Sequence, residues 1–105
     1  MIETVTARLP LACWRGDRGT YHGVIFLGEP AKQISTYARL YRLEFGTQRG
    51  FGSVKVIARI GNTDWKTSVF PQKSSAQWIL LVSKKVMAAE RLTPGWEINV
   101  SLDLI

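Results

Sequence analysis

The side chains best suited to covalent chemistry in this sequence are Cys13 and His22, its one cysteine and its one histidine. A thiol beside an imidazole can act as a nucleophile activated by a general base, provided that the segment between the two residues folds back on itself. The same pattern also fits a buried or half-buried cysteine and a strand histidine without a chemical role. We favour this second interpretation, and a hydrolytic or small-molecule site at the pair stays open as an alternative.

Metal and phosphate-transfer chemistry have less support. Structural zinc sites take several cysteine and histidine ligands, which a single residue of each type does not supply. The aspartates Asp17, Asp64 and Asp103 are scattered along the chain, and no segment has the spacing of a phosphate-cradling loop. The sequence therefore predicts a protein that is not an enzyme and that uses no cofactor and no metal.

Basic residues between positions 49 and 66 favour a different chemistry, the binding of an anion. Segment 49–56, RGFGSVKV, partly fits the signature of RNA-recognition motifs, but serine and valine stand where stacking aromatic residues belong. We therefore expect electrostatic capture of an anionic partner, such as nucleic acid or another polyanion, with one phenylalanine stacking. The residues expected to do this are Arg49, Phe51, Lys55, Arg59 and Lys66.

The four tryptophans raise the question of a ligand pocket or an interface. Trp65 belongs to a predicted core face and Trp78 adjoins an apolar strand, so core packing accounts for both. Trp14 and Trp96 stand near predicted loops and are the better candidates for an exposed interface. A protein-interaction or homodimerisation module that uses these two residues is the alternative to anion binding.

Most of the basic candidates are positioned by segment 53–70, which has the pattern of a β-hairpin around Gly61-Asn62. Glycine accepts the positive φ required at the first central position of a type II′ turn. Counting outward from the turn sets Arg59 opposite Asp64 and fixes the register of the whole hairpin. Side chains alternate along strands, so one face is predicted to be core and the other polar. The core face comprises Val54, Val56, Ala58, Trp65, Thr67 and Val69, and the polar face comprises Lys55, Ile57, Arg59, Asp64, Lys66 and Ser68.

Alternation and turn-forming residues divide the rest of the chain. Strands are predicted over residues 3–9, 20–27, 77–82 and 97–104, the last with Ile98, Val100, Leu102 and Leu104 on one face. Residues 10–19 are predicted to be a loop, because proline, glycine and aspartate concentrate there.

Two helices are also predicted. The first covers about residues 30–43 and turns inward a face made of Ala31, Ile34, Ala38 and Tyr41, supported by Tyr37 and Leu40. The second begins after Ser83, whose hydroxyl can cap it, and runs to about Leu92. Its predicted inward residues are Val86, Ala89 and Leu92.

Length and composition limit the possibilities further. A chain of 105 residues with 46% hydrophobic content forms one domain, residues 1–105, with one core. No apolar run approaches the roughly 18–20 residues that cross a bilayer, and the start lacks the order of a signal peptide. The net charge of +6 suits an anionic partner. Since a single cysteine fits a reducing compartment, we expect a cytoplasmic protein without membrane contact.

A short internal sequence repeat, which we call the internal echo, indicates two related halves. Val5-Thr-Ala-Arg8-Leu9 aligns with Val56-Ile-Ala-Arg59-Ile60 at an offset of 51 residues, and Trp14 aligns with Trp65 at the same offset. Each half is predicted to run strand, loop, strand and helix. We therefore expect two pseudo-repeated halves that close one small β-barrel, which would leave few exposed edges.

Several segments of the second half carry a family resemblance by their order and spacing. They are Val54-Lys55-Val56, Trp65 to Pro71, the apolar stretch 79–82, Ser83 to Val86, and Leu92 to Gly95. With these segments the chain resembles, over essentially its whole length, the bacterial and archaeal family called domain of unknown function 1905 (DUF1905). The resemblance implies a mainly β fold with two short helices, a helix-capped split β-barrel, and no assigned biochemical role. Trp96 is a departure, since the family usually has an acidic residue after the glycine at that point.

Overall fold

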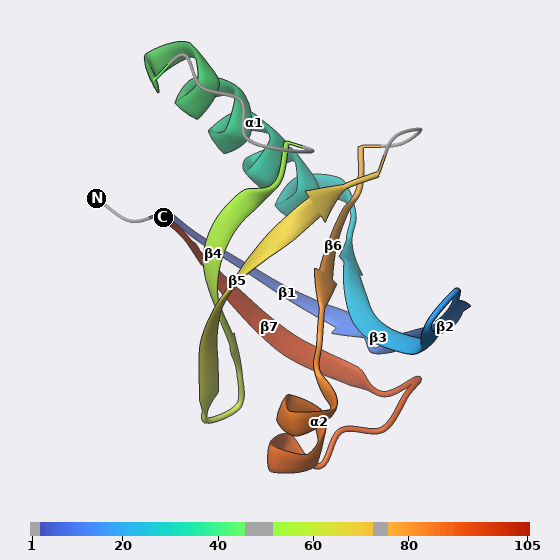
Figure 1. Ribbon diagram of the computed structural model, residues 1–105. Coiled ribbons are helices and arrows are strands. Elements are labelled where there is room, and N and C mark those ends of the chain that lie inside the picture. Colours follow the sequence, from blue (N-terminus) through green and yellow to red (C-terminus); the bar gives the residue numbers. More distant parts are fainter. Residues whose placement is uncertain (1–2, 46–51, 73–75) are drawn as a thin grey trace.

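The computed structural model describes residues 3–45, 52–72 and 76–105, which form one antiparallel seven-stranded sheet and two helices (Figure 1). The strand order is β1-β7-β4-β5-β6-β3-β2. The predicted mainly β class with two helices is thus confirmed, and the sheet curls into a half-barrel. In chain order the elements are β1 (Glu3–Pro10), β2 (Ala12–Gly16), β3 (Gly19–Phe26), α1 (Gly28–Phe45), β4 (Val54–Ile60), β5 (Thr63–Pro71), β6 (Trp78–Leu81), α2 (Lys84–Glu90) and β7 (Glu97–Leu104).

The two ends of the sheet are formed by consecutive parts of the chain. β1 ends at Pro10, and after Leu11 the chain enters β2 at the opposite end of the strand order. Leu11 is only 1% exposed. Its N–H donates to the Trp96 carbonyl and its carbonyl accepts from the Gly95 N–H, both at 2.8 Å. Because one residue joins the end strands, the sheet must curl, although no ladder joins β1 to β2 among the described residues.

The prediction of a loop over residues 10–19 is wrong. Residues Ala12–Gly16 form β2, which pairs with β3 from Ala12 opposite Gly23 to Gly16 opposite Gly19. The turn-forming residues serve a much shorter turn at residues 17–18, where Gly19 follows with a φ of +125°. The local composition correctly indicated a turn. Hydrogen bonds with β3, however, extend the strand pairing up to that turn.

The β4–β5 hairpin has the predicted register, with Arg59 opposite Asp64 and Ala58 opposite Trp65. Gly61 has a φ of +60°, whereas among the described residues Arg91 is the one non-glycine residue with positive φ. Asn62 therefore has negative φ, and this combination of signs is that of the predicted type II′ turn.

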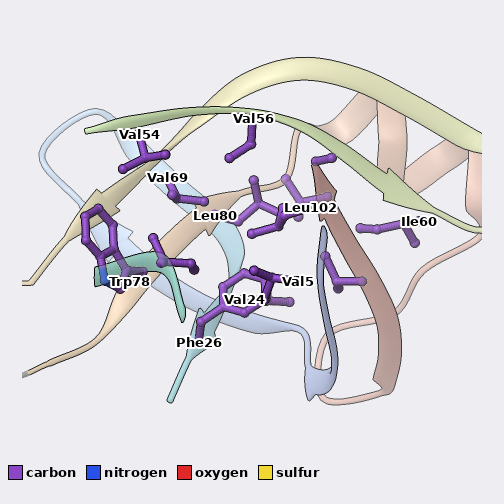
Figure 2. Packing of buried hydrophobic residues seen from close by; sticks show 14 of the residues in the cluster. Val5, Val24, Phe26, Val54, Val56, Ile60, Val69, Trp78, Leu80 and Leu102 are labelled. Atoms are coloured by element: carbon purple, nitrogen blue, oxygen red, sulfur yellow. The ribbon is translucent and has the colours of Figure 1, made fainter. Parts of the chain in front are cut away.

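The core lies inside the curl and is built from alternate residues of the strands (Figure 2). The predicted inward residues of β4 and β7 are buried, and Trp65 packs against the cluster while staying partly exposed. The buried strand residues are Val5, Val24, Phe26, Val54, Val56, Ala58, Ile60, Val69, Trp78, Leu80, Ile98, Val100, Leu102 and Leu104.

Helix α1 contributes Ala31 and Ile34 to the core, as predicted. The prediction is wrong for Leu40, which is 56% exposed, and for Tyr41, which is also exposed. The reason is that the C-terminal part of α1 lies beyond the sheet (Figure 1), so its later turns have no core to face. Burial raises the pKa of the Tyr37 phenol, and the neighbouring Tyr41 and Glu3 raise it further.

Helix α2 begins as predicted, since the Ser83 hydroxyl accepts from the Val86 N–H at 3.3 Å. Val86 is buried and Leu92 packs against the core. Ala89 was predicted to point inward and is exposed. The helix ends at Glu90, two residues earlier than expected, and its inward side runs through Val86 and the partly buried Met87.

A side-chain hydrogen bond links α1 to β6 of the sheet. The indole N–H of Trp78, a residue only 5% exposed, donates to the Ser35 hydroxyl at 2.9 Å. We expect Ser35→Ala to lower the free energy of unfolding in urea by about 1–2 kcal/mol, because the buried indole N–H loses its partner. Thr36→Ala, an exposed change one residue along the helix, is the control and should alter stability by about 0.5 kcal/mol or less. Equal effects of the two variants would contradict this assignment.

Glu90, the last residue of α2, contacts the turn of the hairpin. The Thr63 hydroxyl donates to Glu90 Oε2 at 2.6 Å, and a Cβ added to Gly61 would collide with the same carboxylate. Gly61→Ala should therefore cost about 1–2 kcal/mol for the positive φ and about 1 kcal/mol more for the displaced hydrogen bond. Gly28→Ala is a matched control, because Gly28 has nearly the same φ, +59°, in open space. Thermal unfolding measures the stability of both variants. If both lose the same amount of stability, Glu90 does not have the role assigned to it.

Candidate functional site

Three of the predicted anion-binding residues lie together on the polar outer face of the β4–β5 hairpin. Lys66 lies opposite Ile57, and Lys55 and Arg59 are its diagonal neighbours on β4. All three basic side chains are exposed. Arg49 and Phe51 lie outside the described residues.

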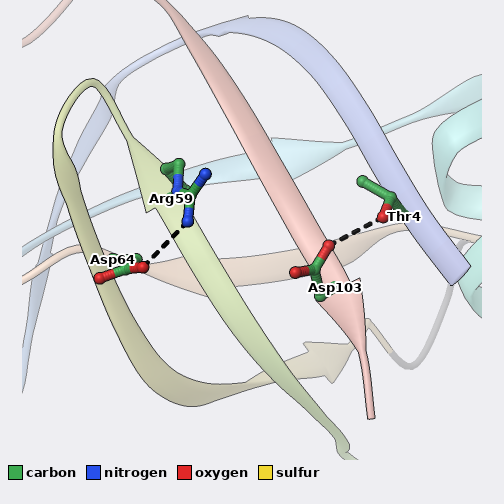
Figure 3. Close-up of polar contacts among 4 residues, drawn as sticks. All are labelled: Thr4, Arg59, Asp64 and Asp103. Atoms are coloured by element: carbon green, nitrogen blue, oxygen red, sulfur yellow. Dashed lines mark hydrogen bonds and ion pairs between the residues drawn. The ribbon is translucent and has the colours of Figure 1, made fainter. Parts of the chain in front are cut away.

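Acidic residues share this outer face and balance much of its charge. Arg59 Nη2 pairs with Asp64 Oδ2 at 3.0 Å, and on β7 the Asp103 carboxylate accepts a 2.8 Å hydrogen bond from Thr4 (Figure 3). The face is therefore not a broad basic surface. Its basic residues are Arg8, Lys55, Arg59 and Lys66, and its acidic residues are Asp64, Glu97 and Asp103.

A groove of about 540 Å³ crosses the same face, and we call it the arginine groove. Its floor is β7, where Ser101 lies between Thr6 of β1 and Arg59 of β4 in one cross-strand row. In the next cross-strand pair on the same face, Arg8 of β1 lies opposite Asn99 of β7. Since Ser101 and Asn99 are short, the longer arginines rise on both sides of them. The arginine groove thus consists of Thr6, Arg8, Arg59, Asn99 and Ser101, with Ala7, Gly61 and Val100.

Both arginines keep donors for a ligand. Arg8 uses Nε in its 3.0 Å pair with Glu97, and Arg59 uses Nη2 in its pair with Asp64. A guanidinium has further N–H groups beyond these single contacts. Both ion pairs are well exposed, so they hold the side chains in place without adding much stability. The arrangement can offer two guanidinium groups to one anionic group.

Arg8 was not among the sequence-based candidates. Its signal was present in the internal echo, which aligns Arg8 with Arg59, and in the alternation of β1, which puts Thr4, Thr6 and Arg8 on one face. What the sequence did not show is that β7 brings β1 and β4 to its two sides.

Cys13 and His22 do meet, as directly opposite residues of β2 and β3. Cys13 is exposed rather than buried or half-buried, and His22 is half-buried. No hydrogen bond joins their side chains in the parts of the chain that the structure describes. Within the same parts, no three His, Cys, Asp or Glu side chains gather closely enough to hold a metal ion. The described helices include none that is both long and apolar enough to cross a membrane.

The two candidate interface tryptophans lie in different surroundings. Trp14 is half-buried and stacks on Tyr21, with ring centroids 6.4 Å apart and planes 25° apart. Trp96 is 58% exposed just before β7. Register puts Trp14 in a larger set of outward apolar residues, which we call the apolar outer face: Trp14, Tyr21, Ile25, Phe70, Ile79 and Leu81.

Comparison with known proteins supports the family resemblance. The profile of one family, described as Domain of unknown function (DUF1905), matches residues 10–102 and so includes β2 to β6, both helices and most of β7. Searches of curated proteins and of solved structures gave no match. On the strength of this match over almost its full length, the chain belongs to the DUF1905 family.

Proposed function

We propose that this protein is a non-enzymatic binding module that takes an anionic group of its partner, such as a nucleic-acid phosphate, in the arginine groove. The observation that supports this most is the position of Arg8 and Arg59 on the two strands that flank β7, Arg8 opposite Asn99 and Arg59 opposite Ser101, each with unused donors. Guanidinium groups match the geometry of phosphate and carboxylate oxygens and bind them strongly. Lys55 and Lys66 lie on the same face and extend the contact.

The charge balance of the face favours recognition of a discrete anionic group over capture of a long stretch of backbone. Each phosphate that a protein neutralises adds to the salt dependence of binding. Two arginines working in one groove predict a modest salt dependence, with a slope of log affinity against log salt of about −2. Arg49 and Phe51 remain part of the proposal on sequence grounds, with Phe51 stacking on a base.

We also propose that the two halves of the chain are related, as the internal echo indicates. This relation would explain why β1 and β4 each bring an arginine to the same groove. An exposed thiol at Cys13 fits a reducing compartment, which supports the expected cytoplasmic location.

The proposal predicts that both arginines contribute to the binding of a fluorescein-labelled single-stranded oligonucleotide. In fluorescence anisotropy at low salt, Arg8→Ala and Arg59→Ala should each weaken binding about 5–10-fold and reduce the salt slope by about 1. Arg18→Ala is the matched control, because it removes the same charge from the exposed β2–β3 turn. An equal loss in the control, or no binding by the wild-type protein, would reject the proposal.

A second candidate function is self-association through the apolar outer face. Tyr21, Phe70 and Leu81 are exposed there, and contiguous exposed apolar residues mark interaction surfaces. Trp14 belongs to this face, whereas Trp96 is a separate candidate contact.

Self-association predicts a sedimentation mass that rises with concentration towards that of a dimer. Phe70→Lys should return the mass to that of a monomer, because a charge would be buried in the interface. Leu43→Lys is the control: Leu43 is 76% exposed on α1, away from this face, and its replacement should leave the association unchanged. A monomer at every concentration would exclude this function.

A further inference from the structure

A second groove, of about 430 Å³, opens where β6 ends between its two neighbours. β6 has four residues and stops at Leu81, opposite Gly23 of β3, while β3 and β5 continue past it. Beyond the Val82 N–H, which donates to the His22 carbonyl at 2.9 Å, none of the described strands fills the space between them. We call this space the Trp65 groove, and the lining residues that matter here are Thr20 and His22 of β3, Trp65 and Thr67 of β5, and Ser83 and Lys84 at the start of α2.

Several polar groups of this groove have no partner among the residues that the structure describes. The side chains of Thr20, His22, Thr67 and Lys84 and the indole N–H of Trp65 make no hydrogen bond or ion pair with the described residues. His22, Trp65 and Thr67 are half-buried, and Thr20 and Lys84 are exposed. Since no buried side-chain nitrogen or oxygen of the described residues lacks a partner, these groups reach the solvent in the groove and are accessible to a ligand. A cavity in which such groups converge is the usual form of a small-molecule site.

The chemistry of the lining defines the ligand. Lys84 supplies a full positive charge, and the described residues that line the groove include no acidic one. The indole and hydroxyl groups are donors. Trp65 adds a flat apolar wall, one part of which packs on the core. At about 30 Å³ for each water, the volume corresponds to about 14 waters, which is enough for a single-ring or two-ring compound.

We propose that the Trp65 groove binds a small aromatic carboxylate, with the ring against the Trp65 indole and the carboxylate at the Lys84 ammonium group. A singly charged group fits better than a phosphate, because Lys84 is a single point charge without an arginine fork beside it. This site shares no residue with the arginine groove, and its occupancy is independent of the function proposed above.

The test uses ¹H–¹⁵N correlation spectra of the full chain titrated with indole-3-acetate, benzoate and their neutral amides. The Trp65 indole signal, assigned with Trp65→Phe, and the amides of His22, Thr67 and Lys84 should shift saturably with the carboxylates. They should shift at least about tenfold more weakly with the amides, since a charge-assisted bond is lost.

Matched variants decide whether Lys84 is responsible. Lys84→Met, which keeps the length and removes the charge, should weaken carboxylate binding about tenfold. Lys85→Met removes the same charge from the next residue, which is exposed and does not line the groove, and should leave binding unchanged. Three results would overturn the proposal: no shift at millimolar carboxylate, equal affinity for carboxylates and amides, or equal effects of the two lysine variants. Loss of oligonucleotide binding in the arginine variants would not alter any of these results.

Discussion

The passage of the chain through Leu11 is the constraint on which the rest of this structure depends. One buried residue separates the strands at the two ends of the sheet, and two backbone hydrogen bonds tie it to the loop before β7. A flat sheet cannot satisfy this connection, so the sheet curls and encloses the alternate apolar residues of its strands. The core, the exclusion of water from it and the division into an inner and an outer face all follow.

Curling leaves an outer face that is not uniform. Over β1, β7 and β4 this face carries charged residues, several of them in exposed ion pairs. Over β2, β3 and β6 it carries aromatic and aliphatic residues, including the Trp14–Tyr21 stack. The two halves of the outer face thus differ in chemistry, one being charged and the other apolar.

Both grooves arise from irregularities in an otherwise continuous sheet. In the arginine groove the irregularity is in side-chain size, because the short Ser101 lies between larger neighbours. In the Trp65 groove it is in strand length, because β6 ends before β3 and β5. A sheet of equal strands and equal side chains would offer neither. Functional sites on a stable scaffold often lie where the regular pattern of the sheet is interrupted.

The sequence by itself determined the features that depend on residues close together in the chain. Gly61-Asn62 set the turn, the turn set the register of β4 and β5, and alternation then separated core residues from outward ones. The cap at Ser83 was likewise local. Predictions were wrong where pairing or packing with another element decides: β2 forms because it pairs with β3, the next strand, and Leu40 is exposed because α1 extends past the sheet.

Only the tertiary structure decided which residues share a site. Arg8 and Arg59 are far apart in sequence and lie on the two strands that flank β7, and Trp65 and Lys84 line one gap left by a short strand. β7 pairs with both β1 and β4, which are far from it in sequence. Such long-range pairing leaves no local pattern in the sequence, so only the tertiary structure shows it.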